Sequence, residues 1–247
     1  MKTALVIPDC HIPYHDERAY NLMMRVAKDL DPDEVVILGD YADFYAINSH
    51  GKDPNMTHLL ADEISAVVEE LTRLKRTFPK AKRVYIEGNH EFRLARYVKQ
   101  KCPDLYGTFS VPQLLELSIL GFEFVPYTPN QKYSVLGSSL IARHEPLAGG
   151  KHVAQNTAEK AMASVIFGHT HRIQEAQTVT MDGQNLRGIS SGWLGDKESQ
   201  VMQYVKSHHQ WALGFSIVRM LEDGTWFNEL VHILDYRCIV NGYIYEG

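Results

Sequence analysis

Over the first 90 residues, short apolar runs alternate with amphipathic stretches, and this pattern constrains the fold most. Three runs have the character of buried strands: ALVIP (4–8), EVVIL (34–38) and RVYIE (83–87). Between them, residues 17–30 and 58–77 carry apolar side chains at helical spacing, and Pro32 and Pro79 end these helices. Continuous apolar strands separated by helices predict a parallel sheet covered by helices.

After Pro126 the sequence becomes rich in strand-like segments. Five of them stand out: KYSVLG, SSLIARH, SVIFGH, GFSIVRM and WFNELVHIL. Turn signals such as Asp182-Gly183 and Asp223-Gly224 lie between some of these segments, and a helix is predicted near residues 151–162. We therefore expect a β-rich second half.

The composition bounds the class of protein. The chain has 247 residues, 45% of them hydrophobic and 22% charged, so it can bury a globular core. Its three cysteines are too few for a secreted disulfide framework, and no signal peptide or run of eighteen apolar residues is present. We expect a cytoplasmic protein without membrane contact, folded as one domain over residues 1–247. Segments 44–57 and 92–120 are expected to leave the core, either as lids over a site or as surface loops.

The charge is distributed unevenly. A net charge of −5 argues against a protein that coats nucleic acid non-specifically. Between Arg73 and Lys101, however, ten Lys or Arg residues stand against two acids, Glu87 and Glu91. These basic residues form either the solvated faces of two helices or a positive approach for a phosphorylated substrate.

Polar and ionisable side chains follow five of the predicted strands. They are Asp9 and His11, Asp40 and Asp43, Asn89 and His90, His144, and His169 and His171. In open α/β sheets the carboxyl ends of the strands are where ligands bind. So many buried ionisable groups need compensation, and carboxylate and imidazole are good ligands for divalent cations. The seven candidate ligands (this set without Asp43 and His90) exceed what one ion takes. They therefore predict two ions that share a carboxylate, an arrangement suited to phosphoryl chemistry. Cys10 points to the other side of its extended segment and is expected to pack as a small apolar residue.

The ordered motifs D-x-H, G-D-x-x-D, G-N-H-E, H and G-H-x-H, from residue 9 to residue 171, resemble those of the calcineurin-like binuclear metallophosphoesterase superfamily, of the small type found in phage and bacterial genomes. The resemblance implies an α/β fold, a four-layer sandwich in which helices flank a two-sheet β core. It also implies two divalent metal ions, Mn first among the candidates, with Fe, Zn, Ni or Mg as the others. The sequence contains neither of the two common glycine-rich phosphate loops, so it does not support a metal-free nucleotide-binding module.

The resemblance also implies roles for single residues. The implied ligands are Asp9, His11 and His171 for the first ion, Asn89, His144 and His169 for the second, and Asp40 for both. His90 would act at the scissile phosphate by stabilising charge or protonating the leaving oxygen, and Asp43 would orient a ligand or His90. Asn89 and Arg93 are candidates for contact with the substrate, although Arg93 could equally cap or solvate its helix. The implied reaction is attack on phosphorus by a metal-bridging hydroxide.

Departures from the family pattern bear on the substrate. Where protein Ser/Thr phosphatases have a glycine and two arginines, this chain has Ile12, Phe44 and Glu87. The missing arginines and the basic stretch favour a phosphodiester substrate, in single-stranded nucleic acid or a nucleotide. The alternative is a phosphomonoesterase acting on a nucleotide or a phosphoprotein. A non-catalytic metal-binding scaffold is less favoured, because every expected ligand position is filled.

Four aromatic residues beyond the last motif add a further hypothesis. Trp193 and Trp211 either stack on a nucleobase or pack in the core. His208 and His209 would fall on opposite sides of an extended segment, so at most one of them faces a site.

Overall fold

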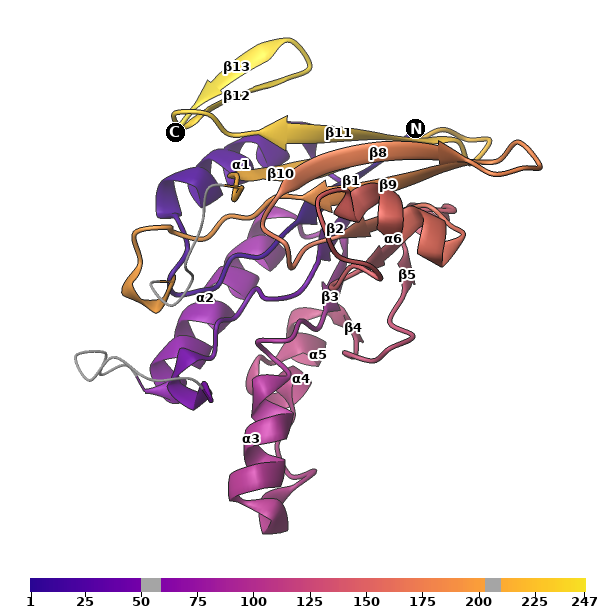
Figure 1. Ribbon diagram of the computed structural model, residues 1–247. Helices are drawn as coiled ribbons and strands as arrows, with labels where there is room; N and C mark the ends of the chain where they lie inside the picture. The colour runs from indigo at the N-terminus through magenta and orange to yellow at the C-terminus, as the bar shows by residue number, and fades with distance from the viewer. Residues whose placement is uncertain (50–58, 203–209) are drawn as a thin grey trace.

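The computed structural model describes residues 1–49, 59–202 and 210–247 (Figure 1). His208, His209 and most of the predicted excursion at 44–57 therefore lie outside the described residues. Two β-sheets pack face to face, and helices cover the outer face of each. None of the helices in the described ranges is long and apolar enough to cross a membrane.

The first sheet has six strands in the order β11-β10-β1-β2-β3-β4. Its parallel strands are β1 (Lys2–Ile7), β2 (Glu34–Ile37), β3 (Lys82–Ile86) and β4 (Phe122–Val125). The antiparallel strands are β10 (Gly214–Met220) and β11 (Trp226–His232). The predicted parallel sheet is thus confirmed for its first three strands. The sequence patterns did not predict β4, because its four residues, FEFV, do not form a continuous apolar run.

Helices α1 (Glu17–Leu30) and α2 (Leu60–Thr77) cover the outer face of this sheet. The Asp16 side chain caps α1 by accepting the Ala19 N–H at 2.9 Å. At the other end, Asp31 adopts a left-handed conformation directly before Pro32, which cannot continue the helix. Both helices were predicted from their apolar spacing, and α2 begins two residues later than expected.

The second sheet has five strands in the order β5-β6-β7-β9-β8. They are β5 (Tyr133–Ser134), β6 (Ile141–Arg143), β7 (Val165–Phe167), β8 (Ile173–Val179) and β9 (Asn185–Ser191). Helix α6 (Val153–Ala161) confirms the helix predicted near residues 151–162, and it packs on the outer face of this sheet. Val6, Val36 and Val84 from the first sheet meet Ala142, Ile166 and Ile189 from the second in one apolar core. The order helix, sheet, sheet, helix is the predicted four-layer sandwich.

The remaining elements lie beside the two sheets, and some of them contribute to the core. Val111, Leu117 and Leu120 are buried against the same core as α1 and α2, and so are Phe44 and Ile47, so the expectation that segments 44–57 and 92–120 leave the core is wrong for these residues. The excursion at 92–120 consists of α3 (Arg93–Lys101), η2 (Pro103–Leu105), α4 (Val111–Leu114) and α5 (Leu117–Leu120). Helix α3 projects from the sheets in Figure 1. Three short 3-10 turns are η1 (Tyr45–Ile47), η3 (Val135–Gly137) and η4 (Gln200–Met202), and a hairpin of β12 (Arg237–Val240) and β13 (Tyr243–Glu246) follows the first sheet.

Five strands from the two sheets deliver the candidate site. Strands β1, β2 and β3 run parallel in one sheet, and β6 and β7 run parallel in the other. Because parallel strands end at the same edge, the segments that follow them converge. The basic residues of segment 73–101 lie at two opposite edges of the first sheet. Six of them lie near the end of α2, at the start of β3 or in the turn between them, at the opposite edge of the sheet from the site. Only the four on α3 come after the site end of β3.

Candidate active site

Sharp turns follow the strands that carry the candidate ligands. Four of these residues have positive φ angles: His11 (58°), Asp40 (47°), His169 (62°) and His171 (58°). Such conformations cost non-glycine residues about 1–3 kcal/mol each and persist only where the surroundings enforce them. Here the turns redirect each chain directly after its strand, so that side chains from separate loops point at one place.

Two motif glycines allow the loops to approach closely. A side chain at Gly88 would overlap Asp40, and one at Gly168 would overlap the carboxylate of Asp9. These contacts explain the glycines of G-N-H-E and G-H-x-H, because only a residue without Cβ leaves room for the neighbouring aspartate.

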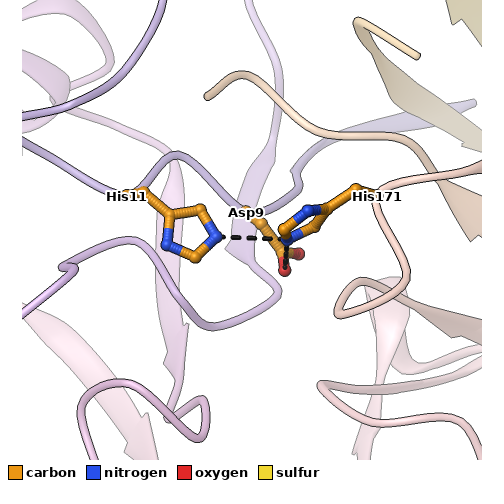
Figure 2. A group of neighbouring side chains, drawn as sticks. All are labelled: Asp9, His11 and His171. Carbon is orange, nitrogen blue, oxygen red and sulfur yellow. Dashed lines mark hydrogen bonds and ion pairs between the residues drawn. The ribbon is translucent and has the colours of Figure 1, made fainter. Parts of the chain in front are cut away.

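Asp9, His11 and His171 form the first cluster of candidate ligands (Figure 2). His171 Nε2 lies 3.1 Å from His11 Nε2 and 3.2 Å from Asp9 Oδ2. All three side chains are buried, and His171 stacks on Trp193 at 4.7 Å. His11 Nδ1 lies 2.9 Å from Asp43 Oδ2, and a proton shared there leaves the His11 Nε2 lone pair directed at the cluster. Two imidazole nitrogens and a carboxylate oxygen at this spacing are donors that suit a divalent cation.

Asp40, His144 and His169 form the second cluster, with Asn89 among them. His144 Nε2 lies 3.3 Å from Asp40 Oδ2 and 2.9 Å from Asn89 Oδ1, which is also 2.8 Å from His169 Nδ1. The Nδ1–H of His144 donates to the Leu38 carbonyl at 2.9 Å, so Nε2 is the nitrogen turned toward the cluster. Asp40 also groups with His11 of the first cluster, so its carboxylate has candidate donors of both clusters nearby.

His90 lies beside both clusters and is 6% exposed. Its Nδ1 is 3.1 Å from the Asp43 carbonyl and 3.2 Å from Asp43 Oδ2, while its backbone N–H donates to Asp40 Oδ1 at 2.8 Å. The Arg93 guanidinium donates to its Nε2 at 2.9 Å, and Asp40 Oδ2 lies 3.8 Å from the same nitrogen. Asp43 thus contacts both His11 and His90. Because His90 also groups with His11 and Asp40, its distances allow a metal ligand as well as a group that acts on the substrate.

Arg93 points into the site rather than along its helix. Its guanidinium donates to the Asp43 carbonyl at 2.9 Å and to Asp43 Oδ1 at 3.2 Å, in addition to facing His90. The sequence left open whether Arg93 contacts the substrate or caps or solvates its helix. These contacts show that the side chain does not extend into solvent along the helix surface. The side chain is 11% exposed, and it lines the cleft that begins beside the second cluster.

Burial and charge act against each other at the site. Burial favours neutral carboxyl groups, but His144 and His90 hold the pKa of Asp40 well below its usual range, and His171 lowers the pKa of Asp9. Conversely, Asp40 raises the pKa of His144 to about 10 in spite of burial, and Asp40 and Asp43 raise the pKa of His90. Without a cation, imidazole protons supply the positive charge that balances the buried aspartates.

We therefore expect divalent-cation affinity to rise with pH. A cation bound by Asp40 and His144 would displace the proton from His144 Nε2. Below the His144 pKa of about 10, each displaced proton makes the affinity for the cation rise tenfold per pH unit. Calorimetric titration of Mn²⁺ into chelator-stripped protein, in two buffers of different ionisation enthalpy, should detect release of at least one proton at pH 7. Affinity that is constant from pH 6 to pH 8, with no proton release, would contradict this balance of charges.

Glu91 is a site-building residue to which the sequence patterns assigned no role. Its fully buried carboxylate accepts the backbone N–H groups of Asp40, Tyr41, Ala42 and Gly88 at 2.9–3.0 Å. The Tyr85 hydroxyl donates to it at 2.7 Å. One side chain therefore holds the loops after β2 and β3 together. Its place at the end of G-N-H-E was the only available signal.

Loss of Glu91 should destabilise the whole fold. Glu91→Ala leaves four buried N–H groups without their acceptor, and at about 1–3 kcal/mol each the free energy of unfolding should fall by at least 4 kcal/mol or so. Tyr85→Phe is the matched control, because it removes one donor to the same carboxylate and should cost about 1 kcal/mol. Urea unfolding monitored by circular dichroism gives both values, and near-equal losses would refute this role of Glu91.

A second buried carboxylate anchors the loop that follows Asp43. Glu63 of α2 accepts the N–H groups of Tyr45 at 2.9 Å and Ala46 at 2.8 Å. Burial raises the pKa of Glu63 to about 7. Helical periodicity indicated only that residues near Glu63 form a helix, because the partner backbone lies in a separate loop.

The structure decides three further sequence hypotheses. Trp193 is fully buried and Trp211 packs against it at 4.6 Å, so Trp193 belongs to the core and is not available to stack on a nucleobase. Cys10 is buried in the core, and burial raises the pKa of its thiol, in agreement with an apolar packing role. Ile12 and Phe44 are fully buried, so neither side chain faces the cleft.

The chain matches the family model described as "Calcineurin-like phosphoesterase" over residues 2–173, a range that contains all seven candidate ligands. It is 29% identical to the "Gene 54 protein" of Mycobacterium phage L5 and 27% identical to that of Mycobacterium phage D29, with 99% of each chain covered in both cases.

Two solved structures are similar at lower identity. The E. coli phosphoesterase YfcE is 14% identical with a TM-score of 0.42, and the match covers 92% of this chain and 98% of that one. The Pseudomonas putida nuclease MPE is 14% identical with a TM-score of 0.38, and the match covers 92% of this chain and 87% of that one.

Proposed function

The chain belongs to the calcineurin-like phosphoesterase family and is a metal-dependent hydrolase of phosphate esters, and from this premise we propose that its substrate is a phosphodiester in nucleic acid or a nucleotide. We further propose that residues 1–247 work as one phosphoesterase domain. The sandwich supplies the rigid strand ends, and the loops between them supply the chemistry.

We assign the two donor clusters to two divalent ions. The proposed ligands are Asp9, His11 and His171 for one ion, Asn89, His144 and His169 for the other, and Asp40 for both. Bound ions would neutralise the phosphate oxygens and activate water for attack on phosphorus. Three carboxylate and imidazole donors within 4.8 Å of one another in each cluster support this assignment.

His90 is proposed to assist departure of the leaving oxygen. Asp43 holds the Nδ1 side of its ring, which leaves Nε2 turned toward Asp40 and Arg93. A phosphate placed between these groups gives both the imidazole N–H and the Arg93 guanidinium an anionic acceptor. His90 can then transfer its proton to the oxygen that leaves.

The observation that carries the diester proposal is a cleft of about 350 Å³ that begins at the second cluster. Its lining includes Asn89 and His169 of the second cluster together with the aromatic residues Phe92 and Tyr127. A phosphodiester carries two substituents on phosphorus, and the cleft offers space for the second one. In addition, the Glu87 carboxylate accepts the Tyr127 N–H at 2.8 Å, so this position supplies no cation for a terminal phosphate dianion.

Hydrolysis of three substrates tests the proposal. We expect Mn²⁺-dependent cleavage of bis-p-nitrophenyl phosphate and of labelled single-stranded DNA, and loss of both activities after chelation. Turnover of p-nitrophenyl phosphate alone would support the phosphomonoesterase alternative. No turnover of any ester by protein that demonstrably holds metal would favour a binding scaffold.

A further inference from the structure

One face of α3 continues the cleft away from the candidate metal ligands. Side chains at positions i, i+3, i+4, i+7 and i+8 of a helix share one face. On α3 these positions are Arg93, Arg96, Tyr97, Gln100 and Lys101. They line a second cavity of about 120 Å³, which shares Arg93 and Arg96 with the larger cleft. Because they share lining residues, the two cavities are neighbours, and together they are here called the α3 groove.

The first part of the α3 groove combines two aromatic rings with a positive charge. The rings of Phe92 and Tyr127 lie 5.1 Å apart, and the Arg96 guanidinium lies 6.0 Å from the Phe92 ring. On the Tyr127 side, Glu145 accepts a hydrogen bond from the Tyr127 hydroxyl. A carboxylate repels phosphate but accepts hydrogen bonds from the N–H groups of bases, the thymine N3–H among them. This part therefore suits a base near Tyr127 and a phosphate near Arg96.

The second part is basic and carries a further ring. Its described lining includes Arg93, Arg96 and Lys101 but no acidic residue. Tyr97, which is 39% exposed, lies among them. From Arg93 to Lys101 the helix rises about 12 Å, which is longer than one nucleotide needs. Alternating cationic and aromatic side chains along a groove are typical of surfaces that bind single strands.

We propose that the substrate is a single-stranded oligonucleotide whose chain, beyond the scissile phosphate, lies along the α3 groove. Its first base would pack on Phe92 and Tyr127, and its next phosphates would pair with Arg96 and Lys101. A duplex keeps its bases stacked inside and cannot present their faces to these rings. This inference rests on the proposed function, because it names the substrate class of the same site.

The test compares two variants that lose the same charge. Arg96→Ala/Lys101→Ala removes two cations from the groove. Arg76→Ala/Lys80→Ala removes two exposed cations near the end of α2, at the opposite edge of the sheet. Binding of fluorescein-labelled dT12 is measured by anisotropy in EDTA over a range of salt concentrations, so that hydrolysis does not enter. At 50 mM salt the groove variant should bind dT12 at least roughly 10-fold more weakly than wild type. The slope of log affinity against log salt concentration should become shallower by about 1.4, for two lost phosphate contacts. The control should match wild type.

The outcomes separate the groove from the proposed function. The proposal that a single strand binds along the α3 groove would be overturned if wild type and both variants bound dT12 with equal affinity, or if both variants lost the same affinity. Preferential binding of duplex DNA or of a phosphopeptide over dT12 would overturn it as well. Hydrolysis of bis-p-nitrophenyl phosphate by the wild-type protein reports on the proposed function independently. If the groove variant binds dT12 more weakly but the wild-type protein hydrolyses no diester, binding of single strands along the α3 groove is supported and the proposed function is rejected.

Discussion

Replacing His90 with alanine should lower hydrolysis of a phosphodiester with a poor leaving group by about 100- to 10,000-fold while metal content stays near wild type. The expectation follows from the position of the ring, which Asp43 holds on one side while Nε2 points toward Asp40 and Arg93. Against the opposing effect of burial, Asp40 and Asp43 raise the pKa of His90, which favours the protonated ring that proton transfer to the leaving oxygen requires.

The leaving group distinguishes proton transfer from charge stabilisation. A p-nitrophenolate ion departs without a proton, so the loss for bis-p-nitrophenyl phosphate should be much smaller than the loss for DNA. His232→Ala removes an exposed histidine from β11 and serves as the control. Metal content is measured on the same samples, because His90 lies within ligand distance of His11 and Asp40. Loss of both ions from His90→Ala would show that the ring is a ligand and would refute its assignment to the leaving oxygen.

Asp40→Ala should empty or scramble both metal positions and abolish hydrolysis. Asp40 belongs to two groups of candidate ligands, with His144 and His169 on one side and His11 and His90 on the other. Removing an outer-shell partner of a metal site costs about 10- to 100-fold in affinity or activity. Removal of a carboxylate shared by two ions should therefore cost more than 100-fold. Elemental analysis after dialysis against Mn²⁺, together with hydrolysis of bis-p-nitrophenyl phosphate, measures both effects.

Two variants control for the loss of a buried carboxylate. Glu34→Gln changes a buried acid at the start of β2, away from the site, where Glu34 accepts the Leu136 N–H at 2.9 Å. This variant should retain two ions and wild-type activity. Asp40→Asn keeps an acceptor for the His90 N–H, so it separates charge from local structure. Retention of two ions at wild-type affinity by Asp40→Ala would overturn the assignment of Asp40 as a shared ligand.

The sequence alone determined the parts of this protein that depend on local order. Apolar runs and helical spacing predicted β1, β2, β3, α1 and α2, because burial of one face imposes a short-range periodicity. The motifs identified the type and order of the candidate ligands, because coordination chemistry restricts the residues that can serve. Strand β4 and the roles of Glu91 and Glu63 escaped prediction. Each depends on partners contributed by separate segments of the chain, which local spacing does not reveal.

Only the tertiary structure decided what these residues do to one another. His171 is 160 residues from His11 in the chain, yet their Nε2 atoms lie 3.1 Å apart because the two sheets pack through a shared core. The same packing buried Trp193, turned Arg93 toward Asp43, and left only the α3 part of the basic stretch beside the cleft. Local sequence specifies which elements form and which donors they carry. Distances between donors depend on long-range packing, where apolar burial and close steric fit select one arrangement of the layers.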